Sequence, residues 1–181
     1  NTLKNYGNTL SINKPSYLKQ GNSKDLENLV SDMKSGNIEA LITYNVNPSY
    51  SLYNADTFNQ ALENVDLKIA TSLYNDETAY LMDYVCPDSH NLESWGDANP
   101  KHGTYSLMQP TISPLFNSRQ FQESLLVWLG KSDYQSYLKN YWIKKGVDWN
   151  RSLHDGYFSL NESNIRTSNF IDNSLSISKK E

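Results

Sequence analysis

Apolar residues between Ser23 and Gly36 recur at helical spacing. The positions that follow the i, i+3, i+4, i+7 pattern are Leu26, Leu29, Val30 and Met33. Ser23 has the side chain of a good N-cap and Gly36 suits a helix stop, so one helix is predicted over this stretch. Residues 38–44 follow within two positions and are mostly apolar, which predicts a strand buried on both faces. We expect this strand to end at the polar turn 45–48.

A second helix and a second strand follow, and with the first strand they predict a parallel sheet. The helix is expected from about Asp56, and its apolar stripe consists of Phe58, Ala61, Leu62 and Val65. Residues 67–72 alternate as a short strand should. A strand, a helix and a strand joined by short links form a βαβ unit, in which the crossover is right-handed in about 98% of cases. We therefore expect an α/β fold with a mainly parallel, Rossmann-like sheet and helices on both faces.

The next stretch of the chain combines an acidic helix start with a third short apolar run. Asn75 or Asp76 can cap a short helix that carries Glu77 and Thr78. Carboxylates are stabilised in a first helical turn by the unpaired backbone N–H groups there. The apolar run 84–86 then predicts a short strand, which a proline ends because it cannot donate to the ladder.

Polar side chains gather at the expected carboxyl edge of this sheet. Asn45 and Asn47 follow the first strand, and Asp76, Glu77 and Thr78 follow the second. The carboxyl ends of parallel strands lie along one edge of the sheet, and open α/β folds bind ligands at that edge. We therefore expect these side chains to meet there. Carboxylate and amide oxygens suit a ligand with N–H donors, such as a purine or pterin edge. The structural alternative is that Asp76 and Glu77 only cap a helix while Asn47 only forms a turn.

The second half of the chain is less regular. Residues 88–114 lose any period apart from a possible edge strand over 104–108, and a loop of this length is usually functional or packs on a partner. An apolar pattern predicts a helix from Phe121 to Gly130, and Ser132 is expected to cap the next helix. The apolar stripe of that helix is Tyr134, Tyr137, Leu138, Tyr141 and Trp142.

Length and composition limit the possible classes of protein. We expect an α/β domain over residues 1–145 and an irregular, partly disordered extension over 146–181, which is rich in Asn and Ser. The net charge of −4, from 16 basic and 20 acidic residues, argues against a nucleic-acid groove. No apolar run approaches the ~20 residues that span a bilayer, so no membrane span is expected. Because the chain starts at Asn1, we expect it to be a piece of a longer protein.

Several kinds of site are disfavoured by the residues present. No glycine-rich phosphate loop follows either strand, so a free-standing nucleotide-binding module has little support. Cys86, Asp88, His90 and Glu93 are metal-ligand types, but their spacing fits no zinc pattern, and we expect no metal. A single cysteine excludes an internal disulfide and any cysteine-only cluster. Cys86 has no base nearby in the sequence and is expected to be a small core residue rather than a nucleophile.

Several short motifs occur in a fixed order along residues 23–130. They are an Asn-Pro turn after a buried strand, a Glu-Thr-Ala start, an aspartate, a proline and a Glu-x-x-Gly, formed by Asn47, Pro48, Glu77, Thr78, Ala79, Asp83, Pro87, Glu93 and Gly96. In this order they resemble the third domain of molybdopterin-dependent oxidoreductases. In that family these turns line a cleft for the guanine dinucleotide form of the cofactor. The resemblance therefore implies that Asn47, Glu77 and Thr78 are the cofactor-binding positions.

A longer stretch of the sequence resembles one branch of that family in particular. Glu93-Ser-Trp-Gly-Asp97, residues 105–115 and Arg119-Gln-Phe121 are similar to the large iron–sulfur subunit of alternative complex III, a bacterial quinol:cytochrome c oxidoreductase. Cys86 departs from the leucine that is usual in the family, which is a packing change. The usual Gly-Thr-x-x-Asn is also replaced, by Gly-Asp-Ala-Asn-Pro. The likeness to this branch implies that the region has lost its cofactor.

The resemblance implies a scaffold fragment of a molybdopterin-oxidoreductase-like iron–sulfur subunit. It implies no catalytic residue and no cofactor in this piece, with iron–sulfur clusters elsewhere in the parent and with Asn47, Glu77 and Thr78 vestigial. The implied partners are other domains of the parent chain and other subunits of a membrane-bound respiratory complex, at the periplasmic face of a bacterial inner membrane. The competing hypothesis is the cofactor-binding domain of an active molybdopterin guanine dinucleotide oxidoreductase.

Overall fold

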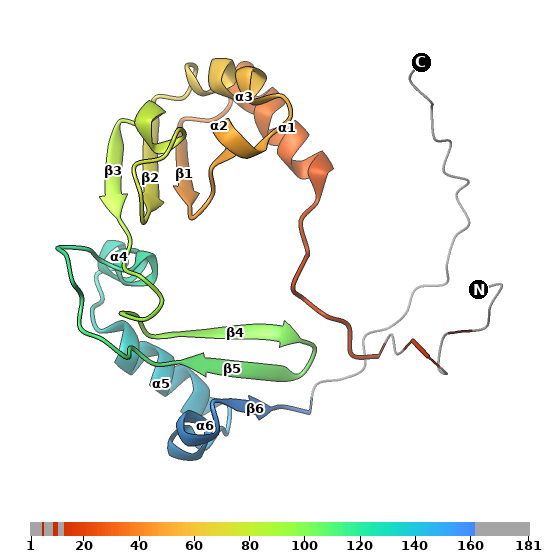
Figure 1. The fold of residues 1–181 in the computed structure, drawn as a ribbon, viewed down its shortest axis with the longest axis vertical. Coiled ribbons are helices and arrows are strands. Elements are labelled where there is room, and N and C mark those ends of the chain that lie inside the picture. The colour runs from red at the N-terminus through yellow and green to blue at the C-terminus, as the bar shows by residue number, and fades with distance from the viewer. Residues whose placement is uncertain (1–4, 6–8, 11–12, 162–181) are drawn as a thin grey trace.

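The computed structural model describes residues 5, 9–10 and 13–161, which include two three-stranded sheets with helices packed around them (Figure 1). The elements of the first half are α1 (Ser23–Lys34), β1 (Ala40–Tyr44), α2 (Pro48–Ser51), α3 (Ala55–Leu62), β2 (Leu67–Ser72), the 3₁₀ helix η1 (Ala79–Leu81) and β3 (Tyr84–Pro87). Those of the second half are β4 (Gly96–Lys101), β5 (Thr104–Met108), α4 (Phe121–Trp128), α5 (Tyr134–Lys144), α6 (Trp149–Asp155) and β6 (Tyr157–Ser159). The tail from 162 onward lies outside the described residues. No helix in the described part of the chain is long and apolar enough to cross a membrane.

The first sheet is parallel, as the βαβ pattern predicts. Its strand order is β1-β2-β3, and the register places Ile42 beside Ile69 and Ile69 beside Tyr84. The α/β class and the parallel pairing of the two predicted strands are therefore confirmed. The third strand, residues 84–87, pairs with β2 in parallel and so extends the sheet. The crossover that connects the two strands, 73–83, has only eleven residues.

One face of this sheet packs on the helices. Its core is aliphatic apart from one ring and consists of Val30, Met33, Phe58, Ala61, Leu62 and Val65. Thr43 of β1 and Ala70 of β2 are also buried, at 8% and 1% exposure. The stripes of α1 and α3 meet here because both helices present apolar residues at the spacing of one helical face. This is the best-predicted part of the molecule.

The opposite face of the parallel sheet is much more open. It meets α4 at its carboxyl end, where the rings of Tyr44 and Phe121 stack at 4.7 Å. Farther along the same face, Ile42, Leu67 and Tyr84 keep 41%, 39% and 61% of their surface exposed. The sequence predicts helices on both faces, whereas this face carries only α4. The crossover between β2 and β3 does not cover this face, because its Met82 packs on the core of α1 and α3 on the other face.

Three local predictions need correction, and each concerns the start of a helix. Asn22 rather than Ser23 caps α1, because its Oδ1 accepts from the N–H of Lys24 at 3.0 Å. Asp133 rather than Ser132 caps α5, from a left-handed backbone with φ of 65°. Asp76 caps the next turn as predicted, because its Oδ1 accepts from the N–H of Ala79 at 2.9 Å, but the expected helix shrinks to η1, so that Glu77 and Thr78 precede it.

The second sheet is antiparallel, with strand order β4-β5-β6. Residues 96–108 form a hairpin, so the prediction of an irregular stretch over 88–114 is wrong for residues 96–103. The possible strand over 104–108 is confirmed as β5, although it is the central strand of the sheet and not an edge strand. Gly103 makes the hairpin possible because it adopts φ of 70° at the turn. The hairpin packs on α5 and α6 through a core that consists of Leu107, Leu138, Trp142, Val147 and Trp149.

The stretch 146–161 is regular, although the sequence predicts an irregular extension from 146 onward. It contains α6 and then β6, which pairs with β5 and completes the second sheet. Gly156 ends α6 in a left-handed conformation with φ of 75°, a helix stop that the sequence reading did not use. The division of the chain into a domain over 1–145 and an extension stays a prediction.

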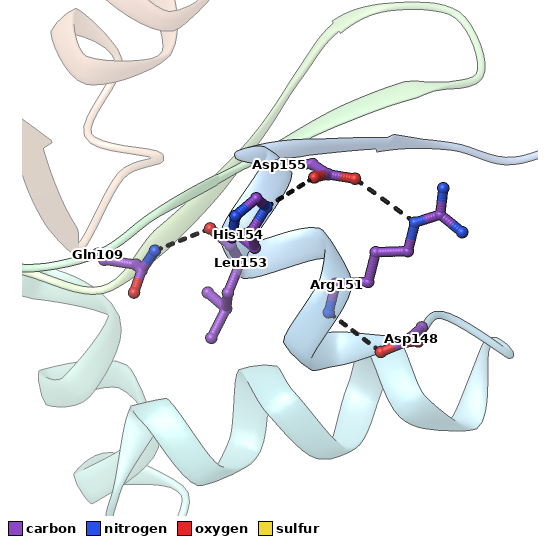
Figure 2. A network of polar contacts seen from close by, with 6 residues as sticks. All are labelled: Gln109, Asp148, Arg151, Leu153, His154 and Asp155. Carbon is purple, nitrogen blue, oxygen red and sulfur yellow. Dashed lines mark hydrogen bonds and ion pairs between the residues drawn. The ribbon is translucent and has the colours of Figure 1, made fainter.

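Polar contacts hold α6 in place at both ends (Figure 2). Asp148 Oδ1 accepts from the N–H of Arg151 at 3.1 Å, and the Arg151 Nε lies 3.5 Å from Asp155 Oδ2. Gln109, just beyond β5, donates its side-chain N–H to the carbonyl of Leu153 at 3.0 Å. The last contact ties the end of the hairpin to the helix that follows it by more than forty residues.

Candidate functional site

The three residues implied as cofactor-binding positions lie together. Asn47 Nδ2 donates to Glu77 Oε2 at 2.7 Å, and Asn47 Oδ1 accepts from the Thr78 hydroxyl at 2.7 Å and from the Thr78 N–H at 3.3 Å. The Thr78 hydroxyl in turn accepts from the N–H of Ser49 at 3.0 Å. The loop after β1 is thereby fastened to the loop after β2. The predicted meeting of Asn47 with Glu77 and Thr78 is confirmed, and their role toward a cofactor stays a prediction.

The hydrogen bonds inside this cluster use most of what the cluster could offer a ligand. Thr78 is 1% exposed, and its hydroxyl both donates and accepts within the protein. Both of the bonds that Asn47 Oδ1 accepts come from Thr78. Glu77 is exposed, and its bond from Asn47 lowers the pKa of its carboxyl group below the ordinary value, which keeps it charged. Of the three residues, Glu77 alone presents accessible acceptor capacity.

A pocket of about 280 Å³ lies where the carboxyl ends of the three parallel strands meet. Tyr44 and Asn45 line it from the end of β1, Leu73 from the end of β2, and Asp88 and Ser89 from the end of β3. The β4 strand and the segment before α4 line the other side. We call this the edge pocket. It occupies the place where open α/β sheets bind ligands, but its lining does not include the predicted trio.

Asp88 is the most buried acidic residue of the edge pocket. It is 6% exposed, and its carboxylate accepts from the Asn45 side chain at 3.2 Å and from the N–H groups of Phe121 and Ser89 at 2.9 and 3.0 Å. Burial nevertheless raises the pKa of Asp88 above its ordinary value, because desolvation outweighs these bonds. Asn45, expected beside Asp76 and Glu77, instead pairs with Asp88. Its backbone has φ of 50°, a conformation that asparagine tolerates better than most residues.

The far side of the edge pocket contains a second acidic group. The carboxylate of Asp97 in β4 accepts from the indole N–H of Trp142 at 2.8 Å, and burial raises its pKa. Tyr134 lines the same side, and burial together with the Asp97 charge raises its pKa to about 12. The described residues that line the pocket include two aspartates and neither a lysine nor an arginine. The pocket therefore offers hydrogen-bond acceptors and negative charge, which suit neutral or cationic groups and disfavour a pyrophosphate.

The cluster of metal-ligand types in the sequence does not converge. Cys86 is exposed on β3, Asp88 points into the edge pocket, and Glu93 accepts from the N–H groups of His90 and Leu115. No group of three or more His, Cys, Asp or Glu side chains within the described residues is arranged to hold a metal ion. The expectation that the protein binds no metal stays a prediction, and the expectation that Cys86 is a core residue is wrong.

The sequence analysis placed Asn45 at this edge of the sheet but did not identify Asp88, Asp97 or Tyr134 as residues that line the edge pocket. Asp88 directly follows the third predicted strand, as Asn45 follows the first, so the rule about strand ends would have found it. Asp97 and Tyr134 come from the second half of the chain. No spacing in the sequence places them opposite the parallel strands, because that placement depends on how the two halves pack.

Comparison with known proteins supports a molybdopterin-oxidoreductase-like relationship. No family model matches the chain. The chain is 30% identical over 124 residues to the menaquinone reductase, molybdopterin-binding-like subunit, of Nitratidesulfovibrio vulgaris, a match that covers 62% of this chain and 18% of that protein. This homology agrees with the resemblance to molybdopterin oxidoreductases that the order of the motifs indicates.

A solved structure shares the fold. Acetylene hydratase from Pelobacter acetylenicus matches with a TM-score of 0.59 and 20% sequence identity, over 72% of this chain and 20% of that one. At this identity the likeness describes the fold alone. The present chain thus spans a fifth or less of the length of either protein.

Proposed function

We propose that this chain is a scaffold domain, without a cofactor of its own, in a molybdopterin-oxidoreductase-like subunit of a quinone-linked electron-transfer complex. The similar protein from Nitratidesulfovibrio vulgaris is named as a subunit of a menaquinone reductase, and its name describes it as molybdopterin-binding-like. The sequence resembles the large iron–sulfur subunit of alternative complex III, which also reacts with a quinone-type substrate. Both likenesses support a respiratory complex.

The finer parts of the proposal come from the resemblance. The parent subunit carries iron–sulfur clusters outside this piece and lies at the periplasmic face of a bacterial inner membrane. Its partners are the other domains of the parent chain and the neighbouring subunits. The open face of the parallel sheet, with Ile42 and Tyr84 exposed, supports a role in packing against such neighbours.

The residues present do not fit the guanine dinucleotide cofactor that the fold family implies. The observation that carries this conclusion is the lining of the edge pocket, where a pyrophosphate would face Asp88 and Asp97 and no lysine or arginine. The hydrogen bonds among Asn47, Glu77 and Thr78 support the same interpretation. They fasten two loops together and leave one exposed carboxylate. We therefore regard the three residues as vestigial cofactor positions with a structural role.

Calorimetric titration with GMP and GDP, with metal analysis of the purified chain, tests this proposal. One wall of a cleft would have to offset an association cost of about 4–15 kcal/mol alone, and each neutral hydrogen bond returns about 0.5–1.5 kcal/mol. We expect no saturable heat with either nucleotide and no stoichiometric molybdenum. Glu63→Ala, which removes an exposed glutamate after α3, is the matched control for Glu77→Ala.

Binding in the micromolar range that disappears in Glu77→Ala and persists in Glu63→Ala would overturn the scaffold proposal. It would favour the competing function, the cofactor-binding domain of an active molybdopterin guanine dinucleotide oxidoreductase. The observation that favours this alternative is the name of the similar protein, which describes it as molybdopterin-binding-like.

A further inference from the structure

A second pocket lies against the same aspartate, between β4 and α5. It has a volume of about 320 Å³, and we call it the tyrosine pocket. Its walls are aromatic and consist of Tyr105, Tyr134, Tyr137, Tyr141 and Trp142. Tyr137 and Tyr141 are 47% and 44% exposed, so the pocket opens to solvent along α5. Asp97 and Tyr134 line both this pocket and the edge pocket, and so separate the two.

The charged residue of the tyrosine pocket is Asp97. The Asp97 carboxylate receives the indole N–H of Trp142, and it forms no ion pair with any residue in the described part of the chain. The Asn99 Oδ1 has no hydrogen-bond partner among the described residues, but it is buried, so a ligand in the pocket does not reach it. Asp97 is therefore the charged acceptor that lines this pocket.

The aromatic walls already attract positive charge. The Nζ of Lys131 lies 6.0 Å from the ring centre of Tyr137, and the Nζ of Lys145 lies 5.7 Å from the ring centre of Tyr141. At these distances the cation–π attraction is real but weak. Neither lysine pairs with Asp97. The two lysines show that cations lie against rings of this pocket, whereas the charge of Asp97 has no cation paired with it among the described residues.

We propose that the tyrosine pocket binds an organic cation that carries N–H donors, a guanidinium or primary ammonium group. The tyrosine rings attract the cation through their π faces, and the Asp97 carboxylate supplies the opposite charge and accepts an N–H. Such a group is present both in free amines and in the arginine or lysine side chain of a partner protein. This site does not depend on the proposed scaffold function, which concerns the opposite side of Asp97.

Titration of the ¹⁵N-labelled 181-residue chain with agmatine, followed by NMR, tests the proposal. The indole N–H of Trp142 reports on the site directly, because its acceptor is Asp97. We expect a saturable shift of that signal in the roughly millimolar range, the affinity reasonable for a small ligand on an open pocket. Guanidinium chloride should give the same shift, and urea, of similar shape but uncharged, should give none at equal concentration.

Four variants separate the contributions. Asp97→Asn should weaken agmatine binding about tenfold or more, as expected when a charge-assisted hydrogen bond is lost. Tyr137→Phe keeps the ring and should bind nearly as the parent does, whereas Tyr137→Leu should bind several-fold more weakly. Tyr53→Leu, at a ring that is 94% exposed and outside the pocket, is the matched control and should change nothing.

The sign of one further effect distinguishes a cation site from an anion site. Lys145→Gln removes a positive charge beside Tyr141, so it should strengthen agmatine binding by a few-fold. Weaker binding in Lys145→Gln, equal binding of urea, or a Trp142 shift with acetate but not agmatine would each overturn the proposal. So would unchanged affinity in both Asp97→Asn and Tyr137→Leu.

A last comparison identifies the source of the cation. If a blocked Gly-Arg-Gly peptide binds at least as tightly as agmatine, the natural occupant is a side chain of a partner protein. If agmatine binds and the peptide does not, the occupant is a free amine. Tetramethylammonium lacks N–H donors and should bind more weakly than either guanidinium ligand, because it cannot donate a hydrogen bond to the Asp97 carboxylate. Tighter binding of tetramethylammonium would contradict the role given to Asp97.

Discussion

The parallel half of this protein and its antiparallel half are held together by different kinds of core. The first core is built from aliphatic side chains and one phenylalanine, all between Val30 and Val65. The second core brings together Leu107 of β5, Trp142 of α5 and Trp149 of α6. Its tryptophan and tyrosine rings carry polar atoms, whereas the first core has none to satisfy. The second half therefore needs hydrogen bonds to the rings of its core, whereas the buried hydroxyls of the first half, such as those of Thr71 and Thr78, are not part of its apolar core.

That requirement explains where polar chemistry appears in the molecule. The indole N–H of Trp142 needs an acceptor, and Asp97 provides it at 2.8 Å. This places a carboxylate inside the second half, at the boundary between the edge pocket and the tyrosine pocket. The first half places its polar groups at the loop ends, where Asn47 and Thr78 join two loops. The predictions below test this contrast, starting with the largest effect.

Trp142→Ala should cause the greatest loss of stability. The ring is 4% exposed and packs against Tyr105 and Phe158, so its removal is expected to cost about 3–5 kcal/mol. Removal of the indole also leaves the half-buried Asp97 without its donor. Urea denaturation followed by circular dichroism measures the loss. Trp142→Phe, which keeps a ring but not the N–H, should fall between the parent and the alanine variant. A loss of under about 1 kcal/mol would mean that the second core is not specific.

Leu62→Ala should destabilise the first half by about 2–5 kcal/mol, through a cavity alone. Leu62 is 2% exposed and belongs to the apolar core of the first half. Leu129→Ala, at a side chain that is 71% exposed, is the matched control and should change the free energy of unfolding by about 0.5 kcal/mol or less. The same urea titration measures both. An equal loss of unfolding free energy in the two leucine variants would contradict a tightly packed aliphatic core in the first half.

The same contrast explains why the fold of the parallel half could be predicted from the sequence and that of the antiparallel half could not. In the parallel half the i, i+3, i+4, i+7 pattern of α1 and the apolar run of β1 are local signals, and the βαβ rule turns them into a sheet. In the antiparallel half the strand Gly96–Lys101 contains Asp97, Asn99 and a proline, and no periodic pattern marks it. It is a strand because of its partner β5, and a pairing between segments is not visible in either segment alone.

The candidate site follows the same division. The meeting of Asn47 with Glu77 and Thr78 was predictable, because all three follow parallel strands that end on one edge. The edge pocket was only half predictable, since Asp97 and Tyr134 reach it from the other half of the molecule. The tyrosine pocket was not predictable at all. Its α5 residues read as one amphipathic face in sequence, and only the packing of β4 against that face makes a pocket.

Asn47→Ala tests whether the predicted trio is structural, and its effect should be intermediate. It removes the acceptor of the buried Thr78 hydroxyl and N–H, which should cost about 1–3 kcal/mol. Glu77→Ala removes an exposed side chain and should change the free energy of unfolding by about 0.5 kcal/mol or less. Thermal or urea unfolding of both variants measures the difference. A large loss in Glu77→Ala with little in Asn47→Ala would show that the loops are joined in some other way.

The smallest expected effect is a change of stability with pH in Asp97→Asn. Burial raises the pKa of Asp97 in the folded protein above the ordinary value of 3.8. The folded state therefore holds this proton more tightly than the unfolded state. Its contribution to stability is fully present below pH 3.8 and is lost as the pH rises through the raised value. At neutral pH the charged carboxylate thus opposes folding, although it accepts the Trp142 N–H.

Asparagine keeps an oxygen for the Trp142 indole and removes the charge, so Asp97→Asn should be more stable than the parent at pH 7. The advantage should shrink as the pH falls and vanish below 3.8, where the aspartate of the parent is protonated in both states. Urea titrations of the two proteins between pH 3 and 8 give this difference. The exposed acids whose pKa values are lowered, such as Glu77 and Asp133, are shared by both proteins and cancel. A variant that is less stable at pH 7 would mean that the carboxylate is favourable in its charged form. Greater stability together with lost agmatine binding would show that the charge opposes folding and is retained for the ligand.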